Sequence, residues 1–237
     1  PEVVLLVLPG PTKLIGPLLA CAFMGIPTAV SFQLVPFRLE YKRWIISFYR
    51  WIRSRGQRWI AISENNRKLL SQSFQMHQTE ISLIYNGALK VQQAHGDVLR
   101  LRRELREELN LPPSALILLT IGRLAPQKGY ADLLEISPEI AREFPNARLL
   151  WVGDGEQMEY FRDRICKYNL AEKIILLGFR SDISKLVAAA DLFVFPTRFE
   201  GGTSIVLLEA MTLGLPLVAS NASGIPEVIH DKIHGLL

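Results

Sequence analysis

Short runs of apolar residues alternate along this chain with longer segments in which apolar side chains recur at helical spacing. In the first third of the sequence, strands are predicted at 3–8, 28–32, 59–62 and 81–85, and helices at 14–24, 41–54 and 64–74. Uninterrupted apolar strands separated by amphipathic helices are typical of a parallel sheet that helices cover. The pattern therefore predicts a succession of β-α units.

A second alternation begins after a turn at Asn86-Gly87 and a polar stretch that runs to Gly96. We interpret the polar stretch as an interdomain linker, and we expect Asp97 to cap a charged helix at 99–109. Strands are then expected at 116–121, 148–152, 174–177, 192–196 and 217–220, and helices at 130–143, 156–168, 183–190, 205–213 and from 225 onward. About five β-α units that run in one direction predict a doubly wound parallel sheet.

The composition is that of a soluble globular protein, with 237 residues of which 49% are hydrophobic and 21% charged. Two cysteines, Cys21 and Cys166, are too few for a disulfide framework, and we expect free thiols in a reducing cytosol. The net charge of +4 does not by itself imply a nucleic-acid partner. Both ends of the chain fall within apolar patterns, so we expect the two sheets to continue in a larger fold.

Two segments bear on membranes. Residues 14–37 carry no charge and are long enough for a membrane span, but Gly25 and Pro27 favour a buried helix, a turn and a strand. The basic and aromatic segment Tyr41–Trp59 is either a peripheral membrane contact, a core-packed helix with a solvated basic face, or a nucleic-acid contact. No nucleic-acid-binding motif accompanies it, so we expect no nucleic-acid partner and a cytoplasmic protein, with the inner membrane surface as the alternative location.

Candidate chemistry is concentrated in loops that follow strands, where doubly wound sheets bind ligands. In the loop 122–129, Gly122 permits a sharp turn, and Arg123 and Lys128 flank the start of a helix. Two cations beside unpaired backbone N–H groups form a site for an anion such as a diphosphate. The alternative interpretation is a surface turn with two solvated cations.

Two further loops have unusual residues. The turn 153–155 is tight, and Asp154 is interpreted as the cap of the next helix, because Met158 excludes a dinucleotide-binding fingerprint. After the strand at 192–196, Gly201 and Gly202 allow close backbone approach to a ligand. Thr203 or Ser204 would cap the following helix and create a second anion position, and Glu209 on that helix either faces solvent or binds a hydroxylated ligand. Together the loops suit a nucleotide sugar.

The order of these motifs is specific. They are Gly122-Arg123-Leu124 with Lys128-Gly129, Gly153-Asp154-Gly155, Phe195-Pro196-Thr197, Glu209-Ala210-Met211, Gly214-Leu215-Pro216-Leu217-Val218-Ala219 and Gly224-Ile225-Pro226-Glu227. From about residue 116 to 237 the chain resembles the C-terminal domain of retaining GT-B glycosyltransferases of the family 4 type, the glycosyl transferases group 1. A weaker resemblance at 60–86 matches the end of the family's N-terminal domain.

The resemblance implies an α/β fold of the GT-B kind, with two Rossmann-like, doubly wound parallel-sheet domains that face each other across a cleft. Residues 1–88 would be the C-terminal portion of the N-terminal, acceptor-side domain. Residues 89–237 would be the C-terminal nucleotide-sugar-binding domain, without its end. The family's N-terminal acceptor loop would lie upstream of Pro1.

The resemblance also implies the activity, a transfer of sugar from a nucleoside-diphosphate-sugar donor to a saccharide, lipid-linked or small-molecule acceptor, with retention of anomeric configuration. Arg123 and Lys128 would hold the diphosphate and stabilise the leaving group. Glu200 would contact the donor sugar, and Glu209 would bind the ribose hydroxyls. The remaining donor-binding positions would be Gly122, Gly201, Gly202, Thr203 and Ser204. With these two cations on the leaving group, the resemblance implies no metal and no cofactor besides the donor, which agrees with the absence of an Asp-x-Asp motif.

Two departures from the family pattern keep other functions open. Glu200 and Glu209 are one residue further apart than the family's paired glutamates, and Gly201 stands at the expected first position. Gln33 stands near the place of a family histidine, and an amide cannot act as a base. A non-catalytic GT-B-like module that binds a nucleotide sugar or a partner protein, or a phosphorylase, are the alternatives.

Overall fold

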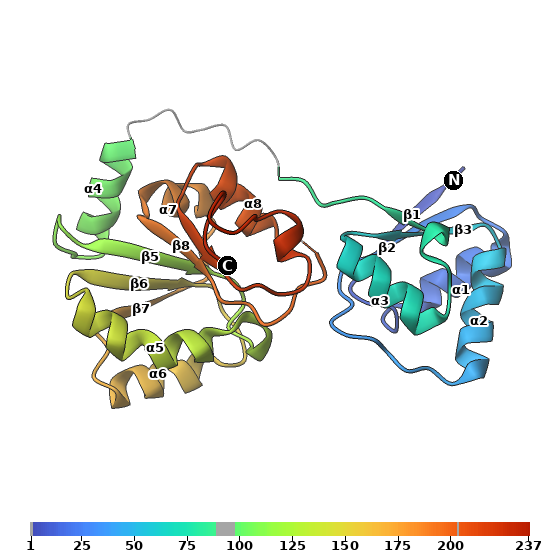
Figure 1. Ribbon diagram of the computed structural model, residues 1–237, viewed down its shortest axis with the longest axis horizontal. Helices are drawn as coiled ribbons and strands as arrows, with labels where there is room; N and C mark the ends of the chain where they lie inside the picture. The colour runs from blue at the N-terminus through green and yellow to red at the C-terminus, as the bar shows by residue number, and fades with distance from the viewer. Residues whose placement is uncertain (1, 89–97, 203) are drawn as a thin grey trace. The chain divides into compact units, whose positions relative to one another are not determined.

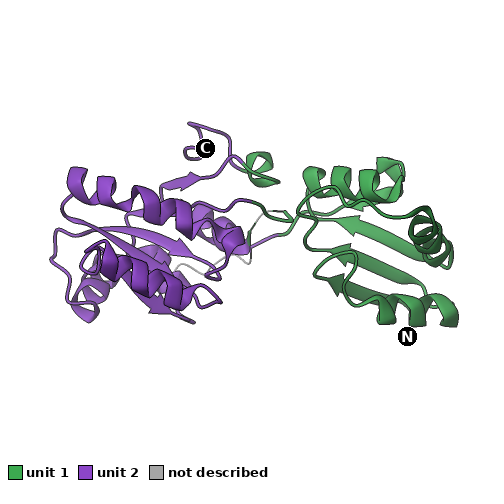
Figure 2. Cartoon of the chain, turned by 90° about the horizontal axis from the view of Figure 1, so that it is seen from below, with its two compact units in different colours: residues 1–86, 199–204, 222–228 green, residues 87–198, 205–221, 229–237 purple. Residues whose placement is uncertain are grey.

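The computed structural model describes residues 2–88, 98–202 and 204–237. These residues form two compact units, each built on a parallel sheet (Figure 1). The first unit comprises residues 1–86, 199–204 and 222–228, and the second comprises 87–198, 205–221 and 229–237 (Figure 2). Two short segments from the second half of the sequence therefore belong to the first unit.

The first unit has a four-stranded sheet in which the strand order β1-β2-β3-β4 follows the chain. Its elements are β1 (Val4–Leu8), α1 (Ile15–Met24), β2 (Thr28–Phe32), α2 (Arg43–Ser54), β3 (Gln57–Ala61), α3 (Glu64–Phe74), the 3₁₀ turn η1 (Gln78–Glu80) and β4 (Ile81–Leu83). Since right-handed crossovers are the rule and every step runs the same way, α1, α2 and α3 lie on one face of this sheet. Their apolar side chains join one core with those of β2 and β3.

The second unit has a five-stranded parallel sheet of order β7-β6-β5-β8-β9. Its elements are α4 (Val98–Glu108), β5 (Leu116–Ile121), η2 (Pro126–Lys128), α5 (Tyr130–Glu143), β6 (Ala147–Val152), α6 (Met158–Lys167), β7 (Ile174–Gly178), α7 (Ile183–Ala189), β8 (Leu192–Phe195), α8 (Ile205–Thr212) and β9 (Leu217–Ala219). The chain moves outward from β5 to β7 and then returns to the other side of β5. Helices α5 and α6 therefore cover one face, and α7 and α8 the other (Figure 1).

The predicted alternation of strands and helices is confirmed in both units, with boundaries within about two residues. The uncharged segment from residue 14 forms α1, a left-handed turn at Gly25 and β2, as the glycine and proline favoured. Among the described helices, none combines the length and apolar character needed to cross a bilayer. The helix expected from residue 225 is wrong, because only the 3₁₀ turn η3 (Ile225–Glu227) forms there.

Some expectations lie outside the described residues. The linker from 89 to 97, with Asp97 as a helix cap, belongs to this group. Whether the two units are the expected domains 1–88 and 89–237 stays a prediction. Both cysteines are free, with Cys21 buried and Cys166 exposed.

The aromatic residues between 41 and 59 divide between the core and the surface. Tyr49 and Trp59 are buried in the first unit, with their ring centroids 5.9 Å apart, and burial raises the pKa of Tyr49 to about 12. Trp44 and Trp51 on α2 are exposed instead. One face of α2 therefore packs in the core, as one of the three interpretations of this segment predicted. The exposed face of the helix carries Trp44 and Trp51, whereas Tyr49 lies in the core.

A charged cluster fixes α4 to the sheet of the second unit. Arg106 is buried, and its guanidinium donates to the Ala115 carbonyl at 2.7 Å and to Asp191 Oδ2 at 2.8 Å. The same carboxylate oxygen accepts the Ile117 N–H at 2.8 Å, and Arg102 pairs with the other oxygen. Asp191 therefore balances two arginines and satisfies one backbone donor of β5.

We predict that Asp191→Ala lowers the free energy of unfolding of the second unit by about 3 kcal/mol, because a buried guanidinium loses its counter-charge. Glu107→Ala is the matched control on the same helix. Glu107 pairs with the exposed Arg103 at 3.8 Å, and loss of this surface pair should cost less than about 0.5 kcal/mol. Urea unfolding of both variants measures the difference, and equal losses would contradict this role of Asp191.

Candidate functional site

The strand order of the second unit places two predicted loops beside each other. β5 and β8 are neighbours, yet the chain between them first builds β6 and β7 on the far side of β5. Doubly wound sheets bind ligands at such a switch point, beyond the carboxyl ends of the two strands. The loop 122–129 follows β5, and the segment that begins at Pro196 follows β8. Both were singled out from the sequence, and the topology places them at the same edge of the sheet.

The loop 122–129 holds its two cations differently. Arg123 is exposed, whereas Lys128 is half-buried and stands in the 3₁₀ turn η2, just before α5. The methylene groups of Lys128 pass over Gly122, where a Cβ atom would meet them at 3.5 to 3.7 Å. The Lys128 ammonium lies 5.6 Å from the centroid of the Phe195 ring at the end of β8. Lys128 thus lies beside the end of β8 at the switch point, whereas the side chain of Arg123 is exposed to solvent and accessible to a ligand.

The turn 153–155 supports this loop from beneath. The Leu124 N–H donates to the Asp154 carbonyl at 2.9 Å, and the Gln157 N–H donates to the Leu124 carbonyl at 3.1 Å. Both glycines of this turn lie too close to the loop 122–129 for any side chain. A Cβ atom at Gly153 would overlap the Gly122 carbonyl, and one at Gly155 would overlap the Leu124 carbonyl. The predicted helix cap at Asp154 is wrong, because α6 begins only at Met158 and the carboxylate accepts the Gly155 N–H instead.

The segment after β8 holds the loop from the other side. The Gln127 carbonyl accepts the Arg198 N–H at 2.8 Å and the Thr197 hydroxyl at 3.1 Å. Arg198 also forms two hydrogen bonds to the Asp132 carboxylate on α5, at 2.8 and 2.5 Å, which hold the pKa of Asp132 below its usual value. The loop 122–129 is thus held on one side by the turn 153–155 and on the other by Thr197 and Arg198.

The glycines after residue 198 serve a contact that the sequence did not predict. A Cβ atom at Gly201 would overlap the Gln33 carbonyl, and one at Gly202 would lie 2.8 Å from the Ile62 side chain. These two glycines thus accommodate other loops of the first unit, and the expected close approach of a ligand to them stays a prediction. Glu200, beside them, is only 8% exposed, and its backbone N–H donates to Ser223 Oγ at 3.0 Å.

The predicted site residues therefore fall into two groups. Gly122, Arg123 and Lys128 share one loop of the second unit, and half-buried Glu209 lies on α8 of the same unit. Glu200, Gly201, Gly202 and Ser204 belong to the first unit. Thr203 lies outside the described residues. In the described ranges no three His, Cys, Asp or Glu side chains are grouped to hold a metal ion, and metal independence stays a prediction.

Two residues of this region were missed from the sequence. Ser63 caps α3, and the Glu227 carboxylate accepts backbone N–H groups at the start of the same helix. A serine directly before the helix is a recognisable cap signal. Nothing in the local sequence around Glu227 indicates a partner more than a hundred residues away, so that contact needed the fold.

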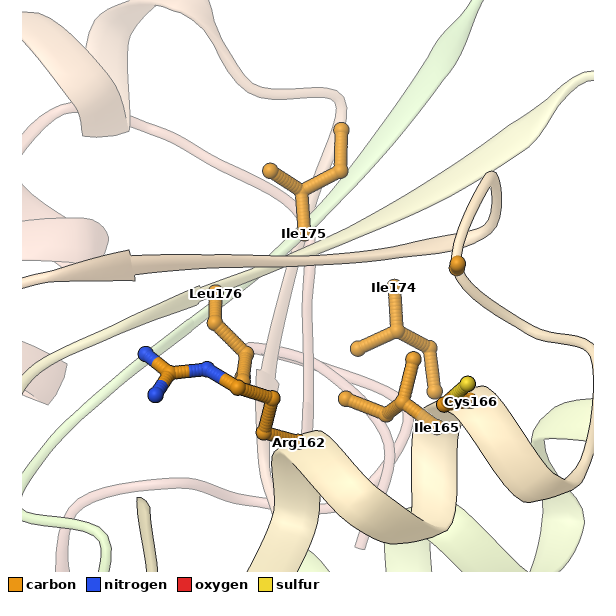
Figure 3. Close-up of a pocket in the computed structure, with 7 residues that line it drawn as sticks. Arg162, Ile165, Cys166, Ile174, Ile175 and Leu176 are labelled. Carbon is orange, nitrogen blue, oxygen red and sulfur yellow. The ribbon is translucent and has the colours of Figure 1, made fainter. Parts of the chain in front are cut away.

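A separate pocket of about 330 Å³ lies between α6 and β7 of the second unit (Figure 3). Its lining is mostly apolar, with Ile165 from the helix and Ile174 and Leu176 from the strand, and Arg162 is its one charged group. This lining lacks the paired cations and backbone donors that a diphosphate requires.

Comparisons with known proteins identify the family of the chain and its fold. Residues 102–237 match the model of the family described as glycosyl transferases group 1. Because that match covers more than half of the chain, the chain belongs to this family. The α/β architecture with two parallel sheets is that of GT-B glycosyltransferases, as expected.

Curated relatives are similar at modest identity. The chain is 26% identical over 228 residues to the UDP-Gal:alpha-D-GlcNAc-diphosphoundecaprenol alpha-1,3-galactosyltransferase of Escherichia coli, covering 92% of this chain and 58% of that protein. It is 28% identical over 179 residues to an uncharacterized glycosyltransferase of Methanocaldococcus jannaschii, covering 75% of this chain and 45% of that protein. The chain thus spans about half the length of these relatives.

Among solved structures, the Anabaena protein HepE in complex with UDP and glucose superposes with a TM-score of 0.81 at 23% identity. The match covers 98% of this chain and 63% of that chain. At this identity the likeness shows the fold.

We predict that Gly129→Ala disrupts the cationic loop through a steric clash. Gly129 has φ +70°, and a Cβ there would overlap the Pro196 carbonyl. Gly214→Ala is a matched control, since Gly214 has φ +69° with nothing within 4 Å of its added Cβ. Both variants should lose roughly 1–2 kcal/mol to left-handed strain, and Gly129→Ala should lose clearly more. Thermal unfolding measures both, and equal losses would rule out the clash.

Proposed function

We propose that this chain is the donor-binding part of a glycosyltransferase that moves a sugar from a nucleoside-diphosphate-sugar donor to an acceptor with retention of anomeric configuration, as in family 4. The observation that carries the proposal is the loop with Arg123 and Lys128 at the β5–β8 switch point. Phosphate groups are bound where cations and backbone N–H groups converge at such an edge.

In this proposal the two cations act on the leaving group. As the bond between the sugar and the diphosphate breaks, negative charge grows on the departing oxygen. Arg123 and Lys128 stabilise that charge, and a positioned charge is most effective where its geometry is fixed beforehand. The contacts of the loop with the turn 153–155 and with Gln127 supply that fixed geometry. The transfer then proceeds without a metal ion.

The carboxylates recognise hydroxyl groups. We assign Glu209 to the ribose of the nucleotide and Glu200 to the donor sugar, with the backbone of Gly201, Gly202 and Ser204 near the phosphates. Glu200 is nearly buried, and its N–H is fixed by Ser223, which suits a side chain that must meet one hydroxyl in one orientation. Gln33 touches the same loop through its carbonyl, and its side-chain amide, which donates one N–H to Ser31 Oγ at 2.9 Å, has a second N–H for a sugar.

The acceptor is a saccharide, a lipid-linked molecule or a small molecule. The E. coli relative is named for a diphosphoundecaprenol acceptor, and HepE was solved with UDP and glucose. These names support a uridine nucleotide as the first donor to try.

We predict that one nucleoside diphosphate among the uridine, guanosine, adenosine and thymidine forms stabilises the full-length protein. At about a hundred times its dissociation constant the ligand adds roughly 2.7 kcal/mol, which thermal unfolding detects. Arg123→Ala should weaken that binding by about tenfold or more in calorimetry, through loss of a charge-assisted hydrogen bond. Lys128→Ala should also abolish sugar transfer.

The exposed Arg142 on α5 provides the matched control, and Arg142→Ala should leave binding unchanged. Binding that survives Arg123→Ala would remove the site assignment. Binding of nucleotide without any turnover of nucleotide sugar would favour a non-catalytic module, and phosphorolysis without nucleotide would favour a phosphorylase.

We propose further that α2 contacts an anionic membrane surface. Trp44 on this helix is 67% exposed, and Phe23 from α1 packs on the partly exposed Trp51 with ring centroids 5.2 Å apart. Exposed arginines at 43 and 50 lie on the same helix. Aromatic and basic side chains together are typical of interfacial helices.

The full-length protein should therefore sediment with vesicles that contain anionic lipid at low salt, and less at high salt because the attraction is screened. Trp44→Ala should reduce sedimentation several-fold, whereas Phe144→Ala, at an exposed aromatic of the second unit, should not. Equal sedimentation of the two variants would exclude α2 as the contact.

A further inference from the structure

The start of α3 is occupied by a carboxylate from a distant segment. Glu227 accepts the Glu64 N–H at 2.7 Å and the Asn65 N–H at 2.8 Å. These two donors have no partner within their own helix, and a negative charge is favoured at that end. The Ser63 hydroxyl satisfies a third donor, the Asn66 N–H, at 3.0 Å. The segment 222–228 is thus held to α3 by a two-point, charge-assisted contact.

The same segment touches the loop that carries Glu200. Gly224 packs so closely that an added Cβ would lie 2.9 Å from Ser63 Cβ and 3.3 Å from Gly202 Cα. One residue earlier, Ser223 Oγ accepts the Glu200 N–H at 3.0 Å. The 3₁₀ turn η3 begins directly after Gly224 and ends at Glu227, so only this short turn separates Ser223 from the residue that contacts α3.

A second connection reaches the loop from Ser63 itself. The Ser63 hydroxyl donates to the Gly201 carbonyl at 3.0 Å while it accepts from Asn66. Ser63 therefore uses both hydrogen-bonding roles of its hydroxyl, one for the helix and one for the loop. The loop around Glu200 is held on both sides, and both connections lead to the first turn of α3.

We propose that Glu227 is a positioning residue for sugar transfer, which fixes Glu200 by holding Ser223 against the loop. This inference rests on the proposed function, in which Glu200 contacts the donor sugar. Glu227 itself touches no substrate in this proposal.

Glu227→Gln is the direct test, because the amide keeps the shape and one acceptor oxygen but loses the charge and the second acceptor. Release of nucleoside diphosphate from UDP-glucose, or from the nucleotide sugar whose diphosphate stabilises the protein, measures turnover. We expect kcat to fall by about tenfold to a hundredfold, since small displacements of a positioned group are costly. Affinity for the nucleoside diphosphate alone should change less than about threefold, because Arg123, Lys128 and Glu209 are untouched.

Glu80→Gln is the matched control. Glu80 is another carboxylate of the first unit that accepts a backbone N–H, from His77 at 3.1 Å, and it also pairs with Arg53; neither partner belongs to the loop around Glu200. Substitution of Glu80 should leave turnover unchanged. Ser223→Ala is a second test, which can be used if Glu227→Gln does not fold. It removes the acceptor for the Glu200 N–H but leaves the contact of Glu227 with α3 in place, and it should lower turnover.

The double variant separates positioning from general stability. If Glu227 acts through Glu200, then Glu227→Gln should have no further effect on turnover once Glu200→Ala is present. Multiplied losses in the double variant, or an equal fall in diphosphate affinity, would overturn the proposal, as would normal turnover of Glu227→Gln. A wild-type protein that uses no nucleotide sugar would overturn the proposed function instead, and faster hydrogen exchange at Glu64 and Asn65 in Glu227→Gln would still establish the contact.

Discussion

The loops of the candidate site depend on close contacts between backbone segments, which are possible because glycine has no side chain. Gly153 and Gly155 bring their turn under the cationic loop, and Gly129 meets the carbonyl of Pro196. In the first unit Gly201 meets Gln33 in the same way. At each position a Cβ would overlap a carbonyl, so the loops cannot sit in these places with any other residue. The positions of the charged side chains therefore depend on backbone contacts that only glycine permits.

The sequence was a reliable guide to the fold because strands and helices leave a periodic record. The strands around Leu119 and Trp151 are apolar runs in the sequence. The end of α1 was predicted from Gly25, which precedes Ile26-Pro27 and has a left-handed backbone in the structure. Arg123 and Lys128 were singled out because they follow a strand whose carboxyl end is a common place for ligands, and their role stays a prediction. In each case the signal lies within a few neighbouring residues.

The parts that escaped prediction are contacts between distant segments. The close approach of Gly201 to Gln33 was not predicted, and neither was the contact of Glu227 with α3. Asp154 was assigned to a helix that begins too late for it. A local sequence indicates that a glycine or a carboxylate makes a structural contact. Which residue it contacts depends on which strands and loops lie side by side in the fold. That order is a property of the whole chain.

The membership of residues 199–204 and 222–228 in the first unit has a consequence for the order of folding. Ser63 and Gly201 are 138 residues apart in sequence, and Glu64 and Glu227 are 163 apart. Contacts of such separation form late, because a long loop must close before they are made. During synthesis, the residues of α3 are made long before Glu227, so the first turn of this helix waits for its carboxylate while the whole sheet of the second unit is being made. Until Glu227 arrives, the backbone N–H groups of Glu64 and Asn65 lack the acceptor that they have in the folded protein.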